Sequence, residues 1–199
     1  LQIPWDRNSG SRPQSMYAVA AHNETIQRRV SLFEEAKIPL SVIDIPEMAQ
    51  RNIAAFFEPQ GQGVALLSFG TDGGLLTFTQ GGELYLARRI EVSLGHLRDA
   101  DENLRRQHFD RVTLEIQRSL DHFDRQFHYV TLNKLLLAPL PDDVGLREHL
   151  KANLYVTVET LDLAQGLDVS GVPDLRNAET QTLFFDVLGA ALRHEEKVL

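Results

Sequence analysis

Three short apolar runs separated by glycine-rich turns lie in the middle of the chain, and they restrict the fold more than any other feature of it. The runs cover residues 64–69, 75–79 and 83–92 and are rich in β-branched and aromatic side chains. Glycines and the Asp-Gly pair between them tolerate the positive backbone dihedral angles of tight turns. The pattern predicts three consecutive antiparallel strands.

A long amphipathic helix is predicted after these strands. Its apolar side chains recur at spacings of three and four, which is the spacing of one helical face, and charged side chains fill the other faces. The apolar residues are Phe109, Val112, Ile116, Leu120, Phe123 and Phe127. This face is expected to pack against the sheet.

Four further helices are predicted. The first covers residues 23–36, with Asn23 as its N-cap. The second begins at Pro46, where the missing amide costs nothing, and ends before Pro59. The others cover residues 144–154 and 180–193. The last is expected to pack around Leu183, Phe184, Val187, Leu188 and Leu192.

Additional strands are predicted at residues 16–21, 38–45, 134–138 and 155–159, whereas residues 7–15 and 166–177 have the composition of loops. The first sixty residues therefore alternate between strand and helix. Such alternation is typical of an α/β fold in which helices cover a sheet.

The composition excludes several classes of protein. The 199 residues include 20 Lys and Arg against 28 Asp and Glu, a formal charge of −8, which opposes binding to nucleic acid phosphates. No apolar run reaches the roughly 18 residues of a membrane span. The absence of cysteine excludes disulfides and a cysteine nucleophile. Because the first residue is Leu1 and not Met, the chain is expected to be a fragment.

No catalytic or metal site is predicted. His122 and His128 are six residues apart, unlike the i, i+4 pair of a helical zinc site, and His108 begins the same helix, so solvated or capping roles are expected. No Gly-x-Ser-x-Gly motif marks a serine nucleophile. The pairs 56–57 and 184–185 are both Phe-Phe, and each is expected to bury one ring, while an exposed second ring could mark an interface.

The glycine-rich loop at residues 69–74 has two interpretations. Its amides and the hydroxyl of Thr71 could cradle a phosphate, as in an anion-binding nest. The same residues also suit an ordinary hairpin turn. Both interpretations stay open at this point.

Short segments taken in order along the chain resemble PilM-type pilus assembly proteins, and most closely the MshI branch of the mannose-sensitive haemagglutinin pilus. These segments are residues 17–21, 26–30, 35–39, 42–47, 49–53, 65–70, 82–90, 115–120, 135–138 and 189–193. The resemblance implies an actin-like, ribonuclease H-like α/β fold, related to the FtsA group and truncated here. Residues 1–58 would be a partial first domain with the remnant of an inserted subdomain, and residues 59–199 a second domain with a reduced outer subdomain.

The resemblance also implies a function. Such a protein would be a cytoplasmic adaptor, peripheral to the bacterial inner membrane, that binds the cytoplasmic tail of an inner-membrane protein of type IV (MSHA-like) pilus assembly. The peptide-binding insertion would be only partly represented, by residues 1–40. From the acidic charge we expect a basic tail. An open edge strand could also pair with a second copy of the chain.

Departures from the family pattern predict a degenerate nucleotide site. The family's first phosphate hairpin has no match here, and Ser68 stands where the second usually has an aspartate. Residues 138–141 read Ala-Pro-Leu-Pro in place of the Gly-Gly of the adenine-side loop, and only residues 95–109 remain of the outer subdomain. We therefore expect no cofactor and no catalytic residue, with a vestigial phosphate loop formed by Ser68, Gly70, Thr71 and Asp72.

The alternative hypothesis is an actin-like ATPase. Gly70, Thr71 and Asp72 would then contact the phosphates of Mg-ATP, and Asp44 or Asp72 would be a displaced metal ligand.

Overall fold

The computed structural model describes residues 3–4, 16–142 and 144–194. The chain divides into two compact units, Leu1–Ile45 and Pro46–Leu199, and each is described by itself. The expected division of homologous domains at residue 58 is a separate matter and stays a prediction. The loop predicted at residues 7–15 lies outside the described residues.

The first unit contains helix α1 (Asn23–Glu35), as predicted. The N-cap is His22 and not Asn23, which is the first helical residue and makes no side-chain cap. The strands predicted at residues 16–21 and 38–45 are wrong, because only Met16 forms a single bridge and the second segment has no regular structure. An apolar run becomes a strand only where a neighbouring strand accepts its backbone hydrogen bonds.

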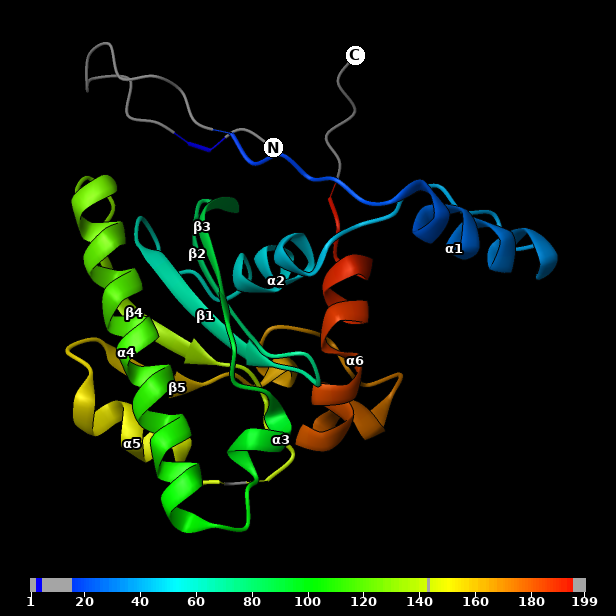
Figure 1. Ribbon diagram of the computed structural model, residues 1–199. Coiled ribbons are helices and arrows are strands. Elements are labelled where there is room, and N and C mark those ends of the chain that lie inside the picture. The colour runs from blue at the N-terminus through cyan, green and yellow to red at the C-terminus, as the bar shows by residue number, and fades with distance from the viewer. Residues whose placement is uncertain (1–2, 5–15, 143, 195–199) are drawn as a thin grey trace. The chain divides into compact units, whose positions relative to one another are not determined.

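The second unit is built on a five-stranded sheet (Figure 1). Its strands are β1 (Gly63–Phe69), β2 (Gly74–Gln80), β3 (Glu83–Ile90), β4 (Leu132–Leu137) and β5 (Thr157–Thr160). They lie in the order β3-β2-β1-β4-β5. The pairs β1–β2 and β2–β3 are antiparallel, which confirms the predicted meander, while β4 runs parallel to both β1 and β5.

One face of the sheet is covered by α4 (Glu102–Gln126), with α3 (Leu94–Leu97) and α5 (Leu146–Asn153) beside it. Helix α4 begins earlier than its apolar pattern, because the side chain of Asp101 caps it by accepting the amides of Asn103 and Leu104. The predicted apolar face is buried, and Phe123 stacks on Phe78 of β2 with ring centroids 4.9 Å apart.

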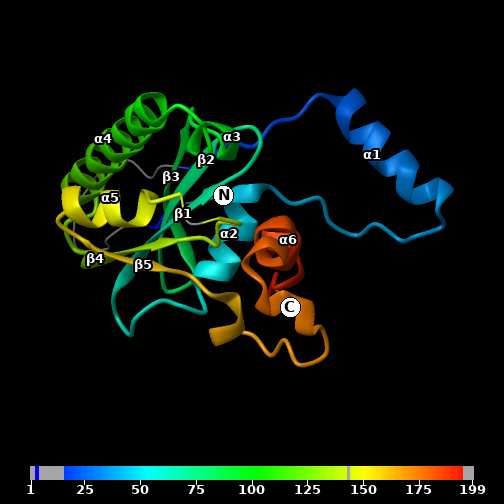
Figure 2. The same cartoon turned by 90° about the horizontal axis from the view of Figure 1, so that it is seen from below.

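The opposite face is covered by α2 (Pro46–Ala54) and α6 (Ala178–Ala191) (Figure 2). Ile53 of α2 and Phe185 of α6 belong to one buried cluster with Leu66 of β1 and Leu136 of β4. The two helices approach closely at Gly189, where a Cβ atom would overlap the backbone of Ala49. This contact requires a glycine. Two short 3₁₀ helices, η1 (Leu163–Gln165) and η2 (Pro173–Arg176), precede α6.

The expected packing of α6 is partly wrong. Leu183, Phe184 and Val187 are exposed, and the buried face is formed by Gln181, Phe185 and Gly189. The close contact at Gly189 decides which side of the helix faces α2. The prediction that one ring of each Phe-Phe pair is buried is confirmed for residues 184–185, and at residues 56–57 the second ring packs against the core cluster while the first is exposed.

Candidate functional site

The carboxyl ends of β1 and β4 lie side by side, and they place the residues singled out from the sequence at one edge of the sheet. Leu67 pairs with Leu137, and the amide of Ala138 donates a 2.8 Å hydrogen bond to the carbonyl of Leu67. Ser68 and Pro139 are therefore neighbours. In the sheet, β2 lies on one side of β1 and β4 lies on the other. The carboxyl ends of β1 and β4 therefore form the topological switch point, which is where ligands bind in open α/β sheets.

The predicted phosphate loop forms the hairpin turn between β1 and β2. The amide of Gly70 donates to the carbonyl of Gly73 at 2.9 Å and closes the turn. Gly73 has φ of 140°, and a Cβ atom there would lie 2.7 Å from the carbonyl oxygen of Ile90, so glycine is required. Thr71 and Asp72 are exposed at the tip of the turn, where the hydroxyl of Thr71 donates a 3.3 Å hydrogen bond to the carboxylate of Asp72. A role of Gly70, Thr71 and Asp72 in holding phosphate stays a prediction.

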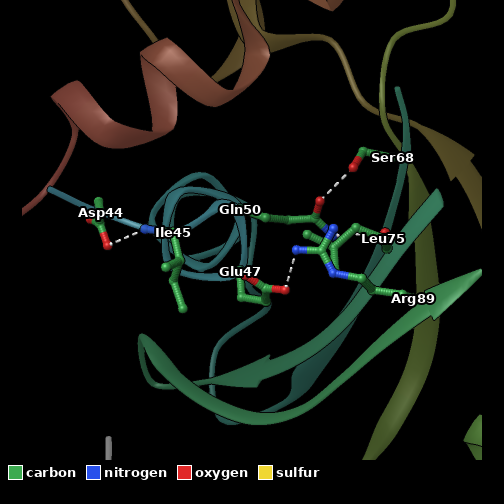
Figure 3. Close-up of polar contacts among 7 residues, drawn as sticks. All are labelled: Asp44, Ile45, Glu47, Gln50, Ser68, Leu75 and Arg89. Carbon is green, nitrogen blue, oxygen red and sulfur yellow. Dashed lines mark hydrogen bonds and ion pairs between the residues drawn. The ribbon is translucent and has the colours of Figure 1, made fainter. Parts of the chain in front are cut away.

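Ser68 is engaged in a buried hydrogen-bond network with α2 (Figure 3). Its hydroxyl donates to the side-chain oxygen of Gln50 at 2.6 Å. The side-chain nitrogen of Gln50 faces the carbonyls of Leu66 and Leu75 at 2.6 and 3.1 Å and the hydroxyl of Thr77 at 3.0 Å. Because Gln50 is fully buried, the amide nitrogen has to face these acceptors and its oxygen has to face Ser68.

Sequence reasoning did not identify Gln50. A signal was present, since Gln50 lies on the same helical face as Ala49 and Ile53 and is a polar side chain among buried positions. A polar residue on the buried face of a short amphipathic helix needs partners inside the protein. Its position therefore indicated an internal network with the sheet.

The loop after β4 is bound to α6. The hydroxyl of Thr182 donates to the carbonyl of Pro139 at 2.8 Å, and Pro139 itself has no amide to offer a ligand. A shallow hollow of about 240 Å³ lies beyond it, lined by Leu140, Asp142, Arg147 and Thr160 among others. Asp142 is already paired with Arg98 at 2.6 Å.

These residues do not fit a magnesium nucleotide. Mg²⁺ is bound in proteins mainly through carboxylates, but the hydroxyl of Ser68 is turned inward and Asp72 is the sole acid of the hairpin. Asp44 belongs to the first unit, where its carboxylate accepts the amide of Ile45 at 2.9 Å. Within the described ranges, no group of three or more His, Asp or Glu side chains could hold a metal ion.

Three charged side chains, from α2, β3 and α6, also lie beside the site. Glu47 of α2 forms an ion pair with Arg89 of β3 at 2.7 Å (Figure 3). Two causes raise the pKa of Asp186 on α6. Partial burial is the larger cause, and the negative charge of Glu47 is the smaller one, while the positive charge of Arg89 opposes the shift. The carboxylate of Asp186 therefore lies in an environment with too little compensating positive charge.

The histidines singled out from the sequence lie on α4 or just beyond it. His108 stacks on His96 with ring centroids 4.7 Å apart, between the start of α4 and α3. His128 lies beyond the end of α4, and its ring contacts Tyr129. His122 is half-buried on α4.

The sheet order and the helical layers define an actin-like α/β fold. A chain of a solved PilM–PilN type IV pilus biogenesis complex has this fold, with a TM-score of 0.67 and 19% identity over 87% of the present chain. Two other solved structures are more distant. A Ppx/GppA family member from Aquifex aeolicus matches with a TM-score of 0.33 and 16% identity, over 51% of the present chain and 36% of its own. Apo ParM of pSK41 matches with a TM-score of 0.38 and 9% identity, over 74% of the present chain and 50% of its own.

The present chain spans 58% of the length of the matched chain in the PilM–PilN complex. No protein-family profile matches the sequence, and no curated protein matches it. In the described part of the chain, no helix combines the length and the apolar character needed to cross a bilayer.

Proposed function

We propose that this protein is an adaptor of type IV pilus assembly that binds the cytoplasmic tail of an inner-membrane assembly protein. The observation that carries the proposal is the fold shared with a chain of the PilM–PilN complex over most of the present sequence. The order of the sequence segments that resemble PilM-type proteins supports it independently. Because the chain spans only part of its structural neighbour, the activity of the whole protein is inferred and not observed.

The geometry of the site favours an adaptor over an enzyme. The hydroxyl of Ser68 is already bonded to Gln50, and the loop after β4 contains Pro139 and Pro141, which lack amide donors. Without a carboxylate at the position of Ser68, the hairpin offers Mg²⁺ only the single carboxylate of Asp72. These features support binding of a partner as the proposed function.

The finer part of the proposal concerns the pilus system and the location. The segments closest to the MshI branch support an MSHA-like system, with the protein at the cytoplasmic face of the inner membrane. A bacterial two-hybrid comparison of tails from different pilus systems of the source organism tests this assignment. Preference for a tail from a non-MSHA system would contradict it.

Direct titration tests the adaptor function. Synthetic peptides that correspond to the cytoplasmic tails of single-span pilus assembly proteins are titrated into the 199-residue chain and into a longer protein that contains it, if the gene encodes one. We expect one tail to bind the longer protein, with weaker binding to the present chain and affinity that falls with salt because the tail is basic. A scrambled peptide is the control. Failure of every tail to bind either protein would refute the adaptor.

The alternative function, an actin-like ATPase, is favoured by one observation, the position of the 70–73 turn at the switch point of the sheet. Calorimetric titration with Mg-ATP separates the two functions. We expect no binding. Micromolar binding that is weakened by Asp72→Asn or Thr71→Ala would establish the ATPase hypothesis.

A further inference from the structure

Helix α6 presents an apolar surface that none of the described residues of the second unit covers. Leu183, Phe184 and Val187 are 75%, 43% and 63% exposed, and their spacing places them along one side of the helix. Ala190 and Ala191 extend this side and are also exposed. The five residues form the α6 outer face, which is about 12 Å long at 1.5 Å per residue.

The outer face is not a consequence of poor packing of the helix. The opposite side of α6 is well buried through Gln181, Phe185 and Gly189. Exposed apolar residues scattered singly are ordinary, but large side chains clustered on one helical face are typical of an interaction site. A partner helix could bury this stripe with side chains at i, i+3 or i+4, and i+7.

Two carboxylates border the outer face. Glu179 and Asp186 are seven residues apart, so they lie two turns apart along the same edge of the stripe. Among the residues that the structure describes, neither forms an ion pair. Arg89, whose positive charge acts on Asp186, is paired with Glu47. A cation supplied from outside would therefore be stabilised at this edge.

We propose that the α6 outer face binds a basic amphipathic helix of a partner protein. The apolar side of that helix covers Leu183, Phe184 and Val187, and Lys or Arg residues seven positions apart pair with Glu179 and Asp186. The proposal does not depend on the pilus function, because it is argued from the apolar and charged residues of α6 alone.

A second copy of the chain fits this face less well. Two α6 helices packed antiparallel about Val187 would bring their Asp186 carboxylates together at the centre of the contact. Like charges in a partly buried interface oppose association. The unfavourable environment that Asp186 already has in the single chain makes this approach more costly. A basic partner reverses the sign of the interaction.

The test uses a fluorescein-labelled helical peptide of leucine and lysine with leucine at the i, i+3, i+4 and i+7 positions. A matched peptide has glutamate in place of every lysine. Binding to the full 199-residue chain is measured by fluorescence anisotropy at low and moderate salt. We expect the lysine peptide to bind, with affinity that falls as salt rises, and the glutamate peptide not to bind.

Variants locate the binding surface. Leu183→Gln and Val187→Gln should each weaken binding about tenfold, and Asp186→Asn by roughly threefold to tenfold. Leu114→Gln on α4 is the apolar control because Leu114 is 44% exposed on the other face of the sheet. Asp121→Asn on the same helix is the acidic control. Both controls should change the affinity less than about twofold.

Four results would overturn the proposal. The first is equal weakening by the α6 variants and the α4 controls, and the second is equal binding of the two peptides. The third is a dimer of the free chain, measured by sedimentation, that Val187→Gln dissociates, since a second copy would then cover the face. If Leu183→Gln impairs folding in circular dichroism, Leu183→Ala replaces it, and unchanged affinity in that variant also counts against the proposal.

Discussion

The hydroxyl of Ser68 on β1 donates a 2.6 Å hydrogen bond to the side-chain oxygen of Gln50 on α2. This bond joins β1, the strand that leads into the 70–73 turn, to α2, which covers one face of the sheet. Gln50 is fully buried and uses its nitrogen for carbonyls of two strands, so Ser68 is the donor that satisfies its oxygen. The Ser68–Gln50 bond therefore contributes to the stability of the fold.

Ser68→Ala should lower the free energy of unfolding by about 1–3 kcal/mol, because it leaves the Gln50 oxygen buried without a donor. Ser68→Asp should destabilise further, since a carboxylate and an amide oxygen both accept hydrogen bonds, and it should not create magnesium binding. Urea denaturation measures both. Ser119→Ala is the control, because the hydroxyl of Ser119 donates to a carbonyl within α4 and its loss should change stability by less than about 0.5 kcal/mol.

Gly189→Ala should destabilise the protein by roughly 1–3 kcal/mol, the usual cost of overpacking. The added methyl group would overlap the backbone of Ala49, and a backbone cannot move aside as a side chain can. Gly171→Ala is the matched control, since a Cβ atom there meets nothing within 4 Å. Thermal unfolding of the two variants should separate them, and equal midpoints would show that α2 and α6 are not in close contact.

Asp186→Asn should stabilise the protein at neutral pH. Burial and Glu47 raise the pKa of Asp186 above its ordinary value, so the ionised carboxylate lowers stability at any pH above the folded-state pKa. The penalty vanishes as the pH falls below the unfolded-state pKa, because the group is then protonated in both states. The stabilisation should therefore decline between neutral and acid pH in urea titrations.

Asp168→Ala provides a control of opposite sign. The backbone amide and hydroxyl of Ser170 lower the pKa of Asp168, so its charge contributes stability at neutral pH that is lost as the pH falls through the folded-state pKa. Asp168→Ala should therefore destabilise at neutral pH and lose its effect in acid. Parallel pH profiles for the two variants would contradict both assignments.

Phe123→Ala should cost about 3–5 kcal/mol, because it leaves a cavity beneath the stacked ring of Phe78 and removes a fully buried phenylalanine from the α4 face. Leu114→Ala removes an exposed side chain from the same helix and should cost less than about 0.5 kcal/mol beyond helix propensity. Guanidinium denaturation distinguishes these outcomes. Similar losses in the two variants would mean that α4 does not pack on the sheet by its aromatic face.

Local patterns predicted the parts of the fold in which spacing alone fixes the structure. The glycine turns and apolar runs of residues 63–90 specified the meander, and the periodic face from Phe109 to Phe123 specified α4 and its buried side. The strand expected at residues 38–45 is wrong, because these residues have the side-chain chemistry of a strand but no regular structure. Pairing between distant segments is not contained in a local pattern.

The sequence by itself determined the α/β class, the meander, the aromatic face of α4 and the place of the 70–73 turn, because side-chain periodicity and turn chemistry act over a few residues. Only the tertiary structure decided that Ser68 bonds to Gln50 and that α6 buries Phe185 while it exposes Leu183. The physical reason is that both outcomes depend on contacts with segments that lie far away in the sequence. At Gly189 the close approach of Ala49 selects the buried side of α6, and that contact joins residues 140 positions apart.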